Sequence, residues 1–212
     1  MAFPQGYKVM AELPGARLVE MTLGPGEEDI VHDHPVHSMY VIDGGKLSIT
    51  DYKDGKPMEP HVVDIPSGAP PIMPAGVHQV KNVGDTKVKI VFVEAFPSCA
   101  PCGPLGGAET PFKVSPECYT SLAENDDWIT GLLTMEPGQK DAFHYHRDHL
   151  IYVLSGNNIT INVGGDESNA IVKDIAPFHG LPAPMAAPPF ASHSLINSGT
   201  ETLKMVFFEM KK

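Results

Sequence analysis

The chain repeats itself, and this repeat is the feature that most limits what it can fold into. A histidine-rich block in the first half returns 112 positions later with the same residues at the same spacing. The matched residues are Gly26, His32, His34, His37, Tyr40, Val41 and Gly44 in the first copy and Gly138, His144, His146, His149, Tyr152, Val153 and Gly156 in the second. The duplication predicts two domains of one fold rather than a single large domain.

A second block repeats at an offset of 115 and lies further along each half. It pairs Pro74, Gly76, His78, Asn82 and Gly84 with Pro189, Ala191, His193, Asn197 and Gly199. Residues 89–94 continue it and match 204–209, while the openings of the halves, 7–9 and 112–114, match more weakly. Eight of the 10 histidines fall in the two blocks, four in each half, so coincidence does not explain the pattern.

A stretch rich in proline, glycine and cysteine separates the halves and suits neither helix nor strand. We therefore predict an N-terminal domain at 1–96, a linker at 97–111 and a C-terminal domain at 112–212, each domain within the usual size range. The linker contains Cys99 and Cys102 in a CxxC arrangement, but no helix start and no second ligand pair accompany them. We expect ordinary loop cysteines.

Within each half the pattern indicates β-strands throughout. Residues 47–50, 88–93, 159–163 and 203–208 are rich in β-branched and aromatic side chains, and turn-forming residues bound them. The segments 82–85 and 197–200 are typical of hairpin turns. No apolar pattern with helical spacing persists for three turns, so we predict an all-β protein, with each half a sandwich or closed barrel of the jelly-roll kind.

The histidine spacing predicts a metal site in each half. Residues i and i+2 of a strand share a face, so His32 and His34 point together. His37 follows His34 by three positions and needs a turn before it to face the same way, and His78 starts a later strand. The same holds for His144, His146, His149 and His193. Imidazole suits zinc, iron, nickel or copper. The alternative, exposed or hydrogen-bonded strand histidines, does not explain two copies of one four-histidine arrangement.

These residues resemble the cupin family over nearly the whole chain. Its first motif matches at Gly26, His32, His34 and Gly44 and again at Gly138, His144, His146 and Gly156; its second matches at Gly68, Pro74, Gly76, His78 and Asn82 and again at Pro189, His193 and Asn197. Three departures stand out: His37 and His149 replace the family's glutamate and come one residue early, the spacing from Gly76 to His78 is one residue short, and Ala191 replaces a glycine.

The resemblance implies two tandem cupin jelly-roll barrels, a pseudo-symmetric bicupin. It also implies one divalent transition metal per domain (Fe, Zn, Ni, Mn or Cu). Its ligands would be His32, His34, His78, His144, His146 and His193, joined by His37 and His149. Four neutral ligands leave the ion's charge uncompensated, which favours a small, anionic substrate.

We expect a metal-dependent enzyme that resembles cupin dioxygenases, because the motif regions offer few placed acids or bases. Asp33 is expected to face outward, Glu94 and Glu209 lie at strand ends, and the tyrosines of the motif strands fall on the face opposite the ligands. A non-oxidative lyase or isomerase remains an alternative. A second alternative is a non-catalytic binding or structural module that its metal ions hold together.

Composition bears on location and partners. The net charge is −11 and no basic patch occurs, which argues against binding to nucleic acid or anionic membranes. We find no signal peptide and no apolar run near the roughly 20 residues that span a bilayer, so a soluble cytoplasmic protein is expected. The acidic runs 27–29 and 124–127 are interpreted as solvated loops. The apolar outer face of the motif strands would pack against the other half or a second copy, giving a homo-oligomer.

Overall fold

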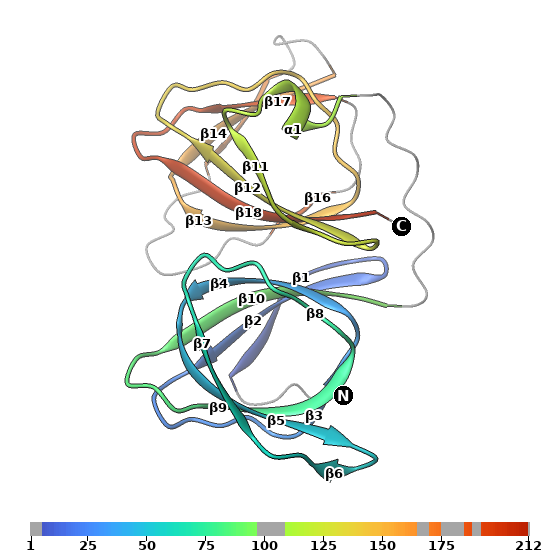
Figure 1. Ribbon diagram of the computed structural model, residues 1–212. Coiled ribbons are helices and arrows are strands. Elements are labelled where there is room, and N and C mark those ends of the chain that lie inside the picture. The colour runs from blue at the N-terminus through green and yellow to red at the C-terminus, as the bar shows by residue number, and fades with distance from the viewer. Residues whose placement is uncertain (1–5, 97–108, 165–169, 175–184, 188–191, 212) are drawn as a thin grey trace. The chain divides into compact units, whose positions relative to one another are not determined.

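A computed structural model describes residues 6–96, 109–164, 170–174, 185–187 and 192–211. Contacts divide the chain into two compact units, Met1–Ser98 and Cys99–Lys212. In Figure 1 the first runs from blue to green and the second from yellow-green to red. The predicted linker lies mostly outside the described residues, with Cys99 and Cys102 in it, so the domain boundaries stay a prediction.

The first unit consists of two antiparallel sheets. One has the strand order β1-β2-β10-β4-β8; the other has the order β3-β9-β5-β6, with β7 also paired to β5. The strands are β1 (Tyr7–Leu13), β2 (Ala16–Leu23), β3 (His32–His34), β4 (His37–Asp43), β5 (Gly45–Lys53), β6 (Lys56–Pro57), β7 (His61–Ile65), β8 (Ile72–Met73), β9 (Gly76–Asn82) and β10 (Val88–Ala95).

The second unit repeats this plan strand for strand in its main sheet. That sheet has the order β11-β12-β18-β13-β16, and a second sheet has the order β15-β14-β17. Its elements are α1 (Pro111–Val114), β11 (Tyr119–Glu124), β12 (Trp128–Met135), β13 (His149–Ser155), β14 (Asn158–Val163), β15 (Ala170–Asp174), β16 (Met185–Ala187), β17 (His193–Asn197) and β18 (Leu203–Met210). The all-β prediction is confirmed, and the part of the chain that the structure describes contains one short helix.

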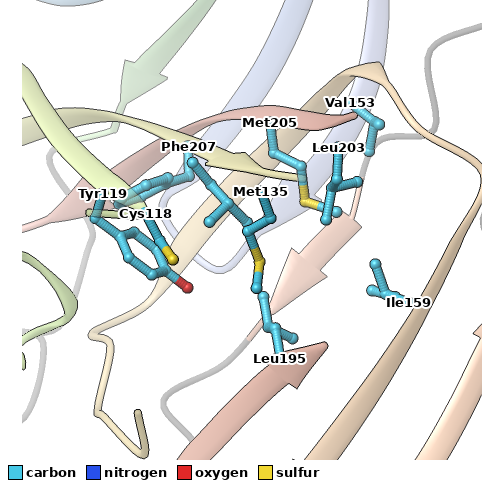
Figure 2. Packing of buried hydrophobic residues seen from close by; sticks show 10 residues of the cluster. Cys118, Tyr119, Met135, Val153, Ile159, Leu195, Leu203, Met205 and Phe207 are labelled. Atoms are coloured by element: carbon cyan, nitrogen blue, oxygen red, sulfur yellow. The ribbon is translucent and has the colours of Figure 1, made fainter. Parts of the chain in front are cut away.

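Alternating burial explains why these segments form half-buried strands. β2 and β12 bury the same positions of their eight residues although their sequences differ. In the second unit ten buried side chains form a hydrophobic core, in which Tyr119 lies beside Phe207 and Cys118 (Figure 2). The first unit has a similar core around Phe92. These cores hold the strands that carry the histidines.

The structure confirms the expected turn and corrects the expected hairpins. β3 ends at His34 and β4 begins at His37, so the chain does turn between them. The segments 82–85 and 197–200 do not join paired strands. β9 pairs with β3 and β5, whereas β10 pairs with β2 and β4, and β17 and β18 likewise lie in different sheets. Each segment instead crosses from one sheet to the other.

The weak match between the openings of the halves was also wrong. Residues 112–114 lie in α1, and the counterpart of β1 is β11. Tyr7 therefore corresponds to Tyr119, at the offset of 112 that the first histidine block has. This correction matters because both tyrosines reach the histidines.

Candidate metal centres

Three predicted histidines of the first unit converge. His32 and His78 are directly opposite in the antiparallel pairing of β3 with β9, and His34 lies on the same face two residues after His32. The ligand nitrogens of these three side chains all lie within 4.8 Å of one another. His34 is buried, while His32 and His78 are partly exposed. The predicted strand geometry therefore brings together donors from two strands.

The second unit reproduces the arrangement. His144 and His193 form an isolated antiparallel bridge, with a backbone hydrogen bond in each direction, and His146 follows two residues later. The ligand nitrogens of this trio also lie within 4.8 Å of one another. His144 and His146 are buried, the former completely.

His37 and His149 adjoin the trios without joining those sets of donor atoms. Each is the first residue of its strand, and its ring centre lies 4.7 Å (His37 to His34) or 4.5 Å (His149 to His146) from the nearest trio member. Their Nδ1 atoms donate to the backbone carbonyls of Pro35 (2.9 Å) and Arg147 (2.8 Å). Their Nε2 atoms therefore carry a free lone pair that could bind a metal. The role of His37 and His149 as fourth ligands stays a prediction.

Hydrogen bonds fix which ring nitrogen carries the proton in the His-x-His pairs. The Nδ1 atom of His32 lies 2.6 Å from the carbonyl of Ile30, and that of His144 lies 2.8 Å from the carbonyl of Ala142. A carbonyl oxygen can only accept, so the proton resides on Nδ1 and Nε2 presents a lone pair. This is the tautomer in which Nε2 can bind a metal.

Carboxylates orient the second histidine of each pair. The Nδ1 atom of His34 donates to Glu94 (2.5 Å) and that of His146 donates to Glu209 (2.8 Å). Burial alone would raise the pKa of Glu94, but hydrogen bonds from His34 and Arg17 lower it. Burial raises the pKa of Glu209. A carboxylate behind a ligating histidine fixes the ring and increases the basicity of the ligand nitrogen.

In each trio, the two donor nitrogens of the His-x-His pair are spaced as a metal requires. His32 Nε2 lies 2.8 Å from His34 Nε2, and His144 Nε2 lies 3.1 Å from His146 Nε2. Two lone pairs this close repel each other unless a cation lies between them. Bonds of about 2.1 Å place neighbouring nitrogens roughly 3.0 Å apart at a right angle and roughly 3.4 Å apart at a tetrahedral one. The spacing therefore fits a metal ion, and it is nearer to the right angle.

The lowered pKa values of several of these histidines disfavour a proton in place of a metal ion at these sites. Burial lowers the pKa of His144 and, well below its usual range, that of His146. Burial and neighbouring histidines lower the pKa of His78 to about 3, and burial lowers those of His37 and His149 to about 4 and about 3. Neutral imidazoles with aligned lone pairs form a donor set suited to a divalent transition metal.

A buried tyrosine–aspartate pair, which sequence reasoning missed, lies beside each trio. The hydroxyl of Tyr7 donates to Asp29 and that of Tyr119 donates to Asp141, both at 2.7 Å. The Tyr119 hydroxyl also lies 3.4 Å from His144 Nε2. Burial raises the pKa of both tyrosines, and the neighbouring carboxylate, Asp29 or Asp141, raises it further.

These pairs correct two expectations. Asp29 belongs to the run 27–29 but is 3% exposed, and its second oxygen accepts the backbone N–H of Val80. Only Glu27 and Glu28 of that run are exposed. Asp141 accepts the N–H of Leu195 in the same way. The motif regions therefore do contain placed acid–base groups, and extending the constant offset of 112 to all residues would have revealed both pairs.

The chain has the fold of known cupins. The protein AerE from Microcystis aeruginosa matches 99% of both chains with a TM-score of 0.60 and 12% identity. Oxalate decarboxylase from Bacillus subtilis covers 96% of this chain, matched over 70% of its own length, with a TM-score of 0.62 and 17% identity. A cupin 2 conserved barrel domain protein from Leptotrichia buccalis covers 97%, matched over 88% of its own length, with a TM-score of 0.52 and 15% identity. No protein-family profile and no curated protein sequence matches the chain.

Among the described residues there is no helix with the length and apolar character needed to cross a membrane.

Proposed function

We propose that each half binds one divalent transition metal through its histidine trio and that the protein is a metal-dependent enzyme for a small, anionic molecule. The observation that carries the proposal is the pair of Nε2 atoms held 2.8 Å or 3.1 Å apart with both protons on the opposite ring nitrogens. The residues that would hold the ion are His32, His34 and His78 in one half and His144, His146 and His193 in the other.

The ligand set supports an anionic substrate. Three neutral imidazoles bring no charge to a 2+ ion, so a carboxylate or enolate would gain from direct binding to it. Three donors leave at least one coordination position for that molecule. A fourth ligand from His37 or His149 would fill the shell of a tetrahedral ion but would still leave two positions on a six-coordinate one.

The first candidate reaction is that of a dioxygenase, which places both atoms of O₂ in the substrate. An all-nitrogen donor set suits Fe²⁺ among other metals, and a bound iron would supply the site for both substrate and O₂. In this case the protein's own task is to orient the substrate and to exclude water.

The second candidate is a non-oxidative lyase or isomerase, and the tyrosine–aspartate pairs favour it. A reaction that moves a proton needs an acid or base within hydrogen-bond reach of the reacting atom. The Tyr119 hydroxyl lies 3.4 Å from a trio nitrogen and already donates to Asp141. It can hold or return a proton at a substrate bound beside His144. Tyr7, whose ring centre lies 5.1 Å from that of His32, would do the same in the first half.

Cobalt substitution tests metal binding and the open position together. Metal-free protein would be loaded with Co²⁺, and its visible absorption recorded with and without oxalate, the anion in the name of one structural neighbour. We expect two ions per chain and a spectrum that changes when oxalate binds. A four-coordinate spectrum that oxalate does not alter would instead support a purely structural role for the ions.

A paired assay separates the two reactions. The Fe²⁺-loaded protein would be incubated with a panel of small carboxylates, with O₂ uptake followed in air and product formation followed by NMR without O₂. Uptake that matches product supports the dioxygenase, and turnover without O₂ supports the lyase or isomerase. Y119F and Y7F are the matched variants: each should remove anaerobic turnover at its own centre, the double variant should abolish it, and oxidative turnover should fall far less.

A further inference from the structure

The two centres differ in what lies behind the orienting carboxylate. In the first half the second oxygen of Glu94 accepts a hydrogen bond from Nε of Arg17 at 2.5 Å, and the two residues are directly opposite in the pairing of β10 with β2. One carboxylate thus joins His34 to a guanidinium. Glu94 is 1% exposed, whereas the Arg17 side chain is 25% exposed and lies against Phe96.

In the second half, no described guanidinium or ammonium group forms a hydrogen bond or ion pair with Glu209, although the charge of Arg147 acts on it from further away and lowers its pKa. Glu209 is opposite Ile129 in the corresponding pairing of β18 with β12. The guanidinium of the nearby Arg147 instead donates from Nη1 to the backbone carbonyl of Lys211 at 2.6 Å. Among the described residues, the ion pair found for Glu209 is the one with His146.

We propose that Arg17 makes the two centres unequal: acting through Glu94, it weakens metal binding in the first half relative to the second. This inference rests on the proposed metal binding. Arg17 is a positioning residue, since it reaches the trio only through Glu94 and His34.

Charge carries the effect. A carboxylate that accepts the Nδ1 proton of a histidine makes Nε2 a stronger donor. The guanidinium shares the negative charge of Glu94, so less of it acts on His34, and it adds a positive charge near a 2+ ion. The guanidinium of Arg147 is bonded to the Lys211 carbonyl rather than to Glu209, so it withdraws less of that carboxylate's charge, and His146 should donate more strongly than His34.

Two other effects would make the first centre bind metal more tightly than the second, which is the opposite of what we propose, so the measurement can tell them apart. Arg17 could raise affinity by holding Glu94 in place, but Glu94 is already buried and bonded to His34. The deeper burial of the second centre should weaken its metal binding, since His144 has no exposed side-chain surface and His32 has 11%. Substitution of Arg17 separates its contribution from burial.

The experiment titrates metal-free protein with Co²⁺ by calorimetry and visible absorption. H193A and H78A variants, each lacking one trio ligand, assign the binding steps to the first and second centres. We expect wild-type affinities to differ by about ten-fold, in the range found for groups behind metal ligands. R17M should raise the Co²⁺ affinity of the first centre about ten-fold. R17K, which keeps the positive charge, should have the wild-type affinity, and I129R should lower the affinity of the second centre.

A matched control lies on the same two strands. Lys89 of β10 pairs with Glu20 of β2 at 3.7 Å, five positions along β10 from Glu94. K89M also removes one positive charge from the sheet and should leave both affinities unchanged. In the Co²⁺-loaded protein, the paramagnetically shifted signal of the His34 Nδ1 proton should move in R17M and stay in K89M. Circular dichroism checks that each variant is folded.

The outcomes distinguish this inference from the proposed function. If wild-type protein binds no Co²⁺, both fail. If two ions bind and R17M leaves the first centre unchanged, the inference fails while the proposed function stands. A weaker first centre in R17M would also overturn it, because Arg17 would then act by holding Glu94 in place.

Discussion

Replacing Tyr119 with phenylalanine tests whether the buried tyrosine–aspartate pair is a structural part of the second centre. The substitution deletes one hydroxyl and keeps the ring against Phe207. Tyr119 is 4% exposed and Asp141 is 3% exposed, so water cannot easily replace the lost hydrogen bond. A buried hydrogen bond to a charged group contributes about 1.5–3 kcal/mol, and we expect Y119F to lower the free energy of unfolding by that amount.

Y7F is the matched comparison, because the same 2.7 Å bond joins Tyr7 to Asp29. Tyr7 is partly exposed, so water can replace some of the loss, and we expect about 0.5–1.5 kcal/mol. The difference between the two halves should therefore be about 1 kcal/mol or more.

The single tryptophan provides the assay. Trp128 is in β12 and is 1% exposed, so its fluorescence follows unfolding of the second half, while far-UV circular dichroism follows both halves. With a urea dependence of about 2 kcal/mol per molar, a loss of 2 kcal/mol lowers the midpoint by about 1 M. A Y119F shift below about 0.25 M, or one no larger than that of Y7F, would refute this reasoning about burial.

Two further predictions concern acid and packing. In metal-free protein, burial lowers the pKa values of His37 and His149 to about 4 and about 3, whereas in the unfolded chain histidine titrates near 6.5. The unfolded chain therefore takes up protons first, and stability should fall as the pH drops from about 6.5 towards 4; urea midpoints that stay constant across this window would contradict it. A Cβ at Gly131 would lie 2.2 Å from the ring of Phe207, so G131A should lower the free energy of unfolding by about 1–3 kcal/mol, measured by thermal unfolding. G76A, which has open space around its Cβ position, should leave the free energy of unfolding nearly unchanged.

The sequence predicted the parts of the fold and site that local spacing determines. Alternation and the constant offsets identified the principal strands, and the i, i+2 rule placed His32 beside His34. The turn before His37 followed from the need to bring its ring to the same face. All of this depends on residues a few positions apart.

What could not be predicted depends on pairing between distant strands. Asn82 was interpreted as the start of a hairpin because it follows one strand and precedes another, but those strands belong to different sheets. Its side chain instead donates hydrogen bonds to the carbonyls of Leu23 and Thr86 where the chain passes from one sheet to the other. Asp29 was interpreted as solvated because it ends an acidic run, and only the approach of β1 and β9 makes it a buried acceptor.

The position of Glu94 shows the same limit. Its place at the end of a strand was visible in the sequence, but its role depends on β2 and on His34, which are about 80 and 60 residues away along the chain. The offset of 115 pairs it with Glu209, and that match identifies both as candidates for a role at the site.

The central claim is that histidines from separate segments share one ion in each half, and a crystal of Co²⁺-loaded protein tests it most directly. An anomalous difference map should contain two peaks per chain, each about 2.1 Å from three or more imidazole nitrogens that include Nε2 of His34 or His146. A map without peaks at the trios, with the rings turned apart, would contradict the account.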